Sequence, residues 1–166
     1  MNLRDPFYSA EVLQESLELA TVVKMNEAEA PLVLDLLGLA IEGESRQAET
    51  LPTPKYLRAA AERLLGEFPS LQMVAATRGS RGSLLVTRDE WNEHHGFPVK
   101  VADGIGAGDA FTAAMTHYLL RGADLATLNE AGNRWGGWVA SQSGAMPALP
   151  DSVREAITAA IERTAD

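Results

Sequence analysis

The sequence contains no cysteine, so neither a disulfide nor a thiolate metal site can form. No apolar run approaches the roughly 20 residues that a bilayer-spanning helix needs. Basic side chains are scarce: 14 Lys and Arg against 23 Asp and Glu give a net charge of −9, which argues against a nucleic-acid-binding surface. Because the N-terminus also lacks the features of a signal peptide, we expect a cytoplasmic protein that binds neither nucleic acid nor membrane.

The composition, 46% hydrophobic and 22% charged over 166 residues, is typical of one globular domain covering residues 1–166. Hydrophobic periodicity and capping residues predict helices over residues 9–20, 26–37, 54–68, 108–121, 125–140 and after Pro150. Short β-branched or apolar runs predict strands over residues 21–25, 71–77, 82–87 and 97–101, with a polar loop over 41–54. Alternation of helices and strands predicts an α/β fold with a mainly parallel sheet.

A glycine-rich stretch, DGIGAGD at residues 103–109, lies between an expected strand and the start of an expected helix. Glycines allow positive φ and close approach of the backbone to a ligand. The N–H groups of Gly106, Ala107 and Gly108 would therefore point at one spot at the positive end of the helix dipole. Such a spot suits a phosphoryl group in transfer, and Asp109 could accept the proton of an attacking hydroxyl.

The same stretch has a simpler interpretation as a strand-to-helix turn that needs glycines, with Asp109 as an ordinary first-turn acid. It is not a Walker A loop, because no Gly-Lys-Ser/Thr follows. A dinucleotide-binding oxidoreductase is a weaker alternative, because the motif comes late in the chain and lacks the spacing of that fingerprint. The residues alone leave the turn and the anion hole both open.

Residues 103–111, DGIGAGDAF, resemble the signature of the PfkB carbohydrate kinases, the family of ribokinase and fructokinase. Gly104 departs from that signature, which has Thr or Ser there, so a hydroxyl beside the anion hole is missing. Two further segments are similar to family elements in the right order. Residues 77–82, TRGSRG, resemble a hairpin along the nucleotide phosphates, and residues 26–29, NEAE, resemble an element that positions Mg²⁺ and phosphate.

The resemblance implies a role for each matching residue. It places Thr77, Gly79 and Gly82 along the phosphates, and Asn133 and Gly144 at the border of the adenine pocket. It places Asn26 and Glu29 in an outer shell around Mg²⁺. Taken alone, Asn26 with Glu29 is a capping box, residues 77–82 are a hairpin turn and Asn133 is a surface helix residue. His94 and His95, with Trp91, are expected in an exposed hairpin rather than at a metal.

The start of the chain, residues 2–8, is similar to a fructokinase-type segment that occurs halfway along complete family members. By that comparison the half that carries the lid and most sugar-binding residues is absent upstream. Arg4 would reach substrate or phosphate, or else form a surface ion pair. An isolated half would leave a sheet edge unpaired, so we expect a homo-oligomer or association with the missing half.

The resemblance implies the nucleotide-binding half of a ribokinase-like, three-layer α/β/α sandwich. It implies ATP-dependent phosphorylation of a sugar hydroxyl, with ATP, Mg²⁺ and, near Asp103 and Ile105, a K⁺ ion. The alternative is a truncated nucleotide-binding fragment that is catalytically incompetent. The sequence does not determine which sugar is used.

Overall fold

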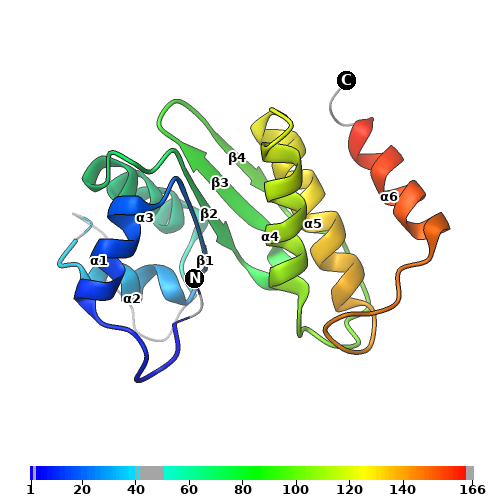
Figure 1. The fold of residues 1–166 in the computed structure, drawn as a ribbon, viewed down its shortest axis with the longest axis horizontal. Helices are drawn as coiled ribbons and strands as arrows, with labels where there is room; N and C mark the ends of the chain where they lie inside the picture. Colours follow the sequence, from blue (N-terminus) through cyan, green and yellow to red (C-terminus); the bar gives the residue numbers. More distant parts are fainter. Residues whose placement is uncertain (2, 40, 42–50, 164–166) are drawn as a thin grey trace. The chain divides into compact units, whose positions relative to one another are not determined.

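The computed structural model describes residues 1, 3–39, 41 and 51–163. In these ranges the chain forms six α-helices and four strands (Figure 1). In chain order they are α1 (Ala10–Leu19), β1 (Val22–Asn26), α2 (Glu29–Leu36), α3 (Pro54–Glu67), β2 (Met73–Thr77), β3 (Ser83–Thr87), β4 (Trp91–His94), α4 (Ala107–Leu119), α5 (Leu125–Ala140) and α6 (Asp151–Glu162). The expected polar loop falls mostly on residues 42–50, outside the described ranges. No helix of the described part is long and apolar enough to cross a membrane.

The four strands form one sheet in the order β1-β2-β3-β4. β1 and β2 are parallel, with Val22 opposite Met73 and Asn26 opposite Thr77, and the chain between them includes α2 and α3. β2 is joined to β3 by residues 78–82, and β3 to β4 by residues 88–90. Links this short connect antiparallel neighbours. The sheet is therefore mixed, and the prediction of a mainly parallel sheet was wrong.

The strand expected over residues 97–101 does not form, and the fourth strand is Trp91–His94 instead. Pro98 has no N–H to donate to a sheet ladder. The aromatic ring of Phe97 lies 4.9 Å from that of His94 and 4.4 Å from the guanidinium carbon of Arg134. The apolar pattern of this segment therefore reflects packing on a helix rather than strand pairing.

The chain divides into two compact units. The first comprises Met1–Arg78 and Leu84–Trp91 and contains the larger apolar core, built on residues that are almost fully buried: Leu17, Met25, Val33, Leu64, Val74 and Leu84. Side-chain caps start two of its helices. Ser9 accepts a hydrogen bond from the N–H of Val12, and Thr53 accepts one from the N–H of Tyr56.

The second unit comprises Gly79–Ser83 and Asn92–Asp166. α4 and α5 pack closely within it, because glycines on α5 face α4: a Cβ at Gly132 would lie 2.6 Å from the Phe111 ring. α6 completes the unit by placing Ile161, which is fully buried, against Ala114 and Ala131. This second unit contains the glycine-rich stretch singled out in the sequence.

Candidate active site

Gly106 is the N-cap of α4 and has φ of 82°, in the left-handed region. A Cβ at this position would lie 2.4 Å from the carbonyl oxygen of Ala145. A side chain here would therefore be strained by its backbone conformation and would also collide with a neighbouring loop. The turn therefore requires glycine at residue 106 for two reasons, the positive φ and the lack of space for a Cβ.

The carboxylate of Asp103 holds the turn to the loop that follows α5. Its Oδ1 accepts a hydrogen bond from the N–H of Ile105 at 3.0 Å, and its Oδ2 accepts one from the N–H of Gly144 at 3.3 Å. The backbone N–H of Asp103 donates to the carbonyl of Ala140 at 3.2 Å. Gly144, predicted to border the nucleotide, is thus placed beside the glycine-rich turn.

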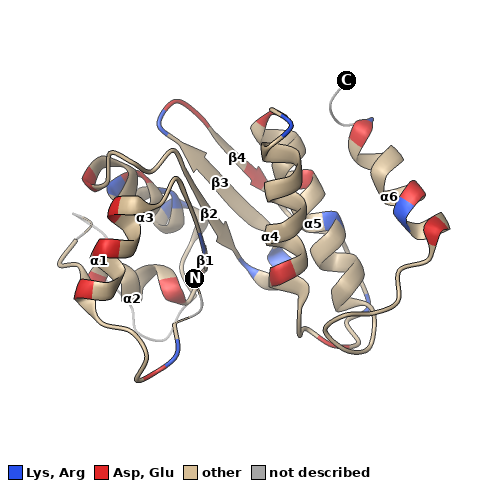
Figure 2. Ribbon diagram, viewed as in Figure 1, with Lys and Arg blue, Asp and Glu red and all other residues tan. Residues whose placement is uncertain are grey.

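The first turn of α4 presents the N–H groups of Ala107, Gly108 and Asp109, for which the helix itself provides no acceptor. The N–H of Ala107 has a weak local contact, with the carbonyl of Gly104 at 3.4 Å. Asp109 is exposed and is the single Asp, Glu, Lys or Arg of α4 (Figure 2). Within the described part of the chain its carboxylate has no hydrogen-bond or ion-pair partner. Backbone donors and an available carboxylate therefore share one helix turn.

The hairpin between β2 and β3 contains the short 3₁₀ turn Gly79–Arg81. Gly82 follows it with φ of 85°, and a Cβ there would lie 1.9 Å from the carbonyl oxygen of His94. Gly79 and Gly82 thus belong to the same compact unit as Gly106 and Asp109. Thr77 belongs to the first unit, where its hydroxyl donates to the carbonyl of Met25 at 3.4 Å.

Asn26 and Glu29 form a reciprocal capping box at the start of α2. The Oδ1 of Asn26 accepts from the N–H groups of Ala28 and Glu29 at 2.9 Å each, and the Oε2 of Glu29 accepts from the N–H of Asn26 at 2.8 Å. The Oε1 of Glu29 accepts from the N–H of Leu3 at 3.1 Å. Both carboxylate oxygens of Glu29 already hold backbone donors, which fits an outer-shell position better than a direct metal ligand.

Arg4 lies in the same first unit as this capping box and is exposed. Its carbonyl accepts from the N–H of Phe7 at 2.8 Å, which closes a turn before α1. Asn2, the other residue of the matching segment, lies outside the described residues.

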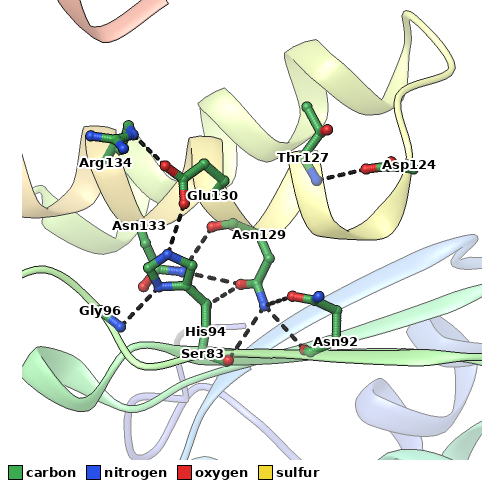
Figure 3. Close-up of polar contacts among 10 residues, drawn as sticks. All are labelled: Ser83, Asn92, His94, Gly96, Asp124, Thr127, Asn129, Glu130, Asn133 and Arg134. Atoms are coloured by element: carbon green, nitrogen blue, oxygen red, sulfur yellow. Dashed lines mark hydrogen bonds and ion pairs between the residues drawn. The ribbon is translucent and has the colours of Figure 1, made fainter. Parts of the chain in front are cut away.

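Asn133 is buried on α5 rather than on its surface. Its amide nitrogen donates to the hydroxyl of Ser83 at 2.7 Å and to the carbonyl of Asn129 at 2.8 Å (Figure 3). No hydrogen bond of the described chain uses its Oδ1. The amide therefore uses its donors within the protein and has an acceptor oxygen without a hydrogen-bond donor among the described residues.

His94 is only about one-fifth exposed, so the expectation of an exposed hairpin was wrong for this residue. Its Nδ1 accepts from the N–H of Gly96 at 2.9 Å, so the neutral ring carries its proton on Nε2 and donates it to the Oε2 of Glu130 at 2.9 Å (Figure 3). Glu130 also binds the Nε of Arg134 one turn further along α5. Sequence reasoning missed this cluster. The sequence signal for it was the presence of three amide and carboxylate residues, Asn129, Glu130 and Asn133, within five positions of a helix otherwise rich in small and apolar residues.

The fold of the chain is similar to that of ribokinase-like proteins. The chain matches a Burkholderia thailandensis nucleoside kinase solved with inosine, with a TM-score of 0.74, 25% sequence identity and coverage of 96% of this chain. It also matches the nucleoside kinase of Methanocaldococcus jannaschii, an archaeal member of the ribokinase family, with a TM-score of 0.68, 27% identity and coverage of 93% of this chain and 45% of that one.

The chain belongs to the pfkB family of carbohydrate kinases, whose pattern matches residues 1–152. Among curated relatives, it is 33% identical over 117 residues to the ATP-dependent 6-phosphofructokinase isozyme 2 of Mycobacterium tuberculosis, an alignment that covers 70% of this chain. It is 35% identical over 102 residues to the probable chloroplastic fructokinase-6 of Arabidopsis thaliana, over 56% of this chain and 27% of that protein.

The chain matches only part of the length of these proteins. The chain spans 34% of the length of the mycobacterial phosphofructokinase and 44% of the Burkholderia nucleoside kinase.

Proposed function

We propose that the protein transfers the γ-phosphoryl group of ATP to a hydroxyl of a sugar, as a fructokinase-like carbohydrate kinase. The observation that carries the proposal is the first turn of α4, where N–H groups without a helical acceptor and the available carboxylate of Asp109 lie together. Membership of the pfkB family supports it. Relatives named as phosphofructokinase, fructokinase and deoxyribokinase agree on the reaction type and differ in substrate.

In this mechanism Asp109 accepts the proton of the substrate hydroxyl as its oxygen forms a bond to the γ-phosphorus. The bond between the γ-phosphorus and the β–γ bridging oxygen breaks, and ADP leaves with that oxygen. The N–H groups of Gly106, Ala107 and Gly108 stabilise the negative charge on the equatorial oxygens during transfer. Because these donors are fixed by a glycine N-cap, they need no reorganisation as the charge develops.

Other residues hold the nucleotide. Gly79 and Gly82, with Thr77 at the end of β2, lie along the phosphates, and Gly144 borders the base. Asn133 offers its amide oxygen to the base, since its amide hydrogens are bound within the protein. Arg4 contacts substrate or phosphate from its exposed turn. These assignments rest on the matching motif positions together with the contacts described above.

Mg²⁺ would neutralise charge on the phosphate oxygens, with Asn26 and Glu29 fitting an outer shell because their oxygens hold backbone N–H groups. A K⁺ site near Asp103 and Ile105 is part of the proposal. A phosphofructokinase-2 of Escherichia coli, 24% identical with a TM-score of 0.71, was solved in complex with potassium.

The test is sugar-dependent release of ADP in a coupled assay, with a panel of ketoses, aldoses and nucleosides. Asp109→Asn should reduce turnover by at least about a hundredfold, the size expected for loss of a general base, and leave ADP affinity unchanged. Asp151→Asn is the matched control, because Asp151 also begins a helix, α6, away from the glycine-rich turn. Equal activity of the wild type and Asp109→Asn would contradict the assignment.

A second candidate is nucleotide binding without phosphoryl transfer by this 166-residue chain alone. The partial coverage favours it, because the chain spans 34% of the mycobacterial relative. A rise in melting temperature with ATP or ADP, combined with no ADP release on any substrate, would select this candidate. No thermal shift with either nucleotide would contradict both.

A further inference from the structure

One face of α5 carries a buried group of polar side chains, Asn129, Glu130 and Asn133, which we call the α5 clamp. The clamp contacts Ser83 and His94 on the β3 and β4 side (Figure 3). Asn129 is fully buried, and Glu130 and Asn133 are each 8% exposed. Burying a polar group costs free energy unless the group is hydrogen-bonded, so these three side chains need hydrogen-bond partners within the protein.

Ser83 is the residue through which the clamp holds the hairpin directly. It is fully buried and follows Gly82, the last hairpin residue. Its hydroxyl donates to the Oδ1 of Asn129 and accepts from the Nδ2 of Asn133, so both of its hydrogen-bonding roles are used. The Nδ2 of Asn129 in turn donates to the backbone carbonyl of Asn92 at 3.0 Å and to its Oδ1 at 2.8 Å. One amide therefore holds the beginning of β3 and the middle of β4 together.

A second route joins the same hairpin to the clamp. Gly82 packs against the backbone of residues 94–96 so closely that no Cβ could fit there. His94 fixes that segment by accepting from the N–H of Gly96 and donating to Glu130. The hairpin is thus tied to α5 both through Ser83 and through the loop on which Gly82 rests.

Other residues of α5 set its distance from the glycine-rich turn. A Cβ at Gly136 would lie 3.1 Å from the carbonyl oxygen of Ala107, in the first turn of α4. α5 therefore touches both the hairpin and the start of α4, and all three belong to the second compact unit. A shift of the hairpin on α5 would change its spacing from the N–H groups of α4.

We propose that Ser83 and Asn129 are positioning residues that hold the hairpin of residues 79–82 at a fixed spacing from the N-terminus of α4, so that both elements bind the phosphates of one nucleotide. This inference rests on the proposed function, since it requires that the chain bind a nucleoside phosphate. Neither residue touches the nucleotide in this arrangement. Each acts through the backbone donors that it keeps in place.

The experiment compares the affinities of the 166-residue chain for ADP and for adenosine, measured by isothermal titration calorimetry. In Asn92→Ala, which removes the side-chain acceptor of Asn129 and leaves the hydrogen bonds of Asn133 in place, the Kd for ADP should rise about fivefold. The Kd for adenosine should change by less than about twofold, because the hairpin contacts phosphate and not the nucleoside. Asp124→Ala is the matched control. It removes the N-cap of the same helix without touching the hairpin, so it should lower the melting temperature and leave both affinities unchanged.

Equal weakening of ADP and adenosine binding, or no change for ADP, would overturn the positioning role while leaving the proposed function standing. A wild type that binds neither ligand would overturn both. Asn92→Ala keeps the backbone acceptor of Asn129, so it is expected to fold. Ser83→Ala removes the hydroxyl that bonds both Asn129 and Asn133, so the Kd for ADP should rise there by at least as much as in Asn92→Ala. An unchanged Kd for ADP in Ser83→Ala would also overturn the inference.

Discussion

Gly104 and Gly106 lie two residues apart in the glycine-rich turn, but they differ in backbone conformation and in the space available for a side chain. Gly106 has positive φ and no room for a Cβ, whereas Gly104 lies outside the left-handed region and a Cβ there would meet nothing within 4 Å. Gly104→Ala should therefore stabilise the chain by about 0.4–1 kcal/mol, by lowering the entropy of the unfolded state. Gly106→Ala should destabilise it by more than that. Urea unfolding followed by circular dichroism measures both.

The Gly104 result also bears on function. The PfkB signature has Thr or Ser at this position, and a Cβ at Gly104 would meet nothing within 4 Å, so Gly104→Ser is the variant that tests the missing hydroxyl. A Gly104→Ala variant less stable than the wild type would contradict the geometry of the turn.

Asp124 caps α5, and the hydrogen bond from the backbone N–H of Thr127 lowers the pKa of its carboxyl below the ordinary value of 3.8. A carboxyl whose pKa is depressed by folding contributes stability above its unfolded pKa and loses it as pH falls through the folded pKa. Asp124→Ala should thus cost about 0.5–2 kcal/mol at pH 7. The difference from the wild type should shrink below about pH 4 as the carboxylate is protonated.

Asp124→Asn is the control for this pH effect. An amide oxygen can still accept the capping hydrogen bond but does not titrate, so this variant should stay close to the wild type at pH 7 and show a weaker acid dependence. Thermal unfolding at a series of pH values measures the stability of each protein. Equal losses of stability in the wild type and Asp124→Ala as the pH falls would contradict the capping role of the carboxylate.

Some residue-level features were readable in the sequence, and others were not. The caps at Ser9 and the reciprocal pair Asn26 and Glu29 follow local rules, because their partners lie within three residues. The contact between His94 and Glu130 joins residues 36 positions apart, and neither flanking sequence indicates it. The catalytic and nucleotide roles of the motif residues stay predictions, whereas the turn that holds them has the glycine geometry that the motif implied.

At the scale of elements, two glycines of α5 distinguish the effect of side-chain packing on stability from the effect of helix propensity. A Cβ at Gly132 would lie 2.6 Å from the Phe111 ring on α4, but a Cβ at Gly137 would meet only Val99 at 3.6 Å. Gly132→Ala should destabilise the chain by about 1–3 kcal/mol through overpacking. Gly137→Ala should stabilise it by up to about 1 kcal/mol through helix propensity.

Chemical denaturation of Gly132→Ala and Gly137→Ala measures the change in the free energy of unfolding for each variant. Adding Phe111→Leu to Gly132→Ala should recover part of the loss, because the smaller side chain vacates the ring position, and the two substitutions should therefore be non-additive. Equal effects of the two glycine substitutions would contradict the close approach of α4 and α5.

The helices were predicted more accurately than the strands, for a physical reason. α5 was expected at residues 125–140 and is found there, since a 16-residue helix shows its period and its cap within its own sequence. A strand of five residues takes its identity from its partners. The run at residues 97–101 has apolar residues that pack beside His94 and Arg134 instead of pairing, and short hairpins around β3 made the sheet mixed.

At the scale of the whole molecule, the family and the layout of its motifs follow from the sequence, because residues 1–152 match the pfkB pattern. The arrangement as a single domain with three layers stays a prediction, as does the homo-oligomer or the association with a missing N-terminal half. The clear result at this scale is that the hairpin glycines and the glycine-rich turn occupy one compact unit. We therefore expect the backbone contacts of these glycines with phosphate to come from this unit.

The most direct test of the central claim is a titration of the ¹⁵N-labelled chain with ADP, followed by amide chemical shifts. We predict that the signals of Gly106, Ala107, Gly108 and Asp109 shift along one saturation curve together with those of Gly79 and Gly82, and that adenosine leaves them in place. Amides of these six residues that do not move when the chain is saturated with ADP would contradict the assignment of the α4 N-terminus as the phosphate site.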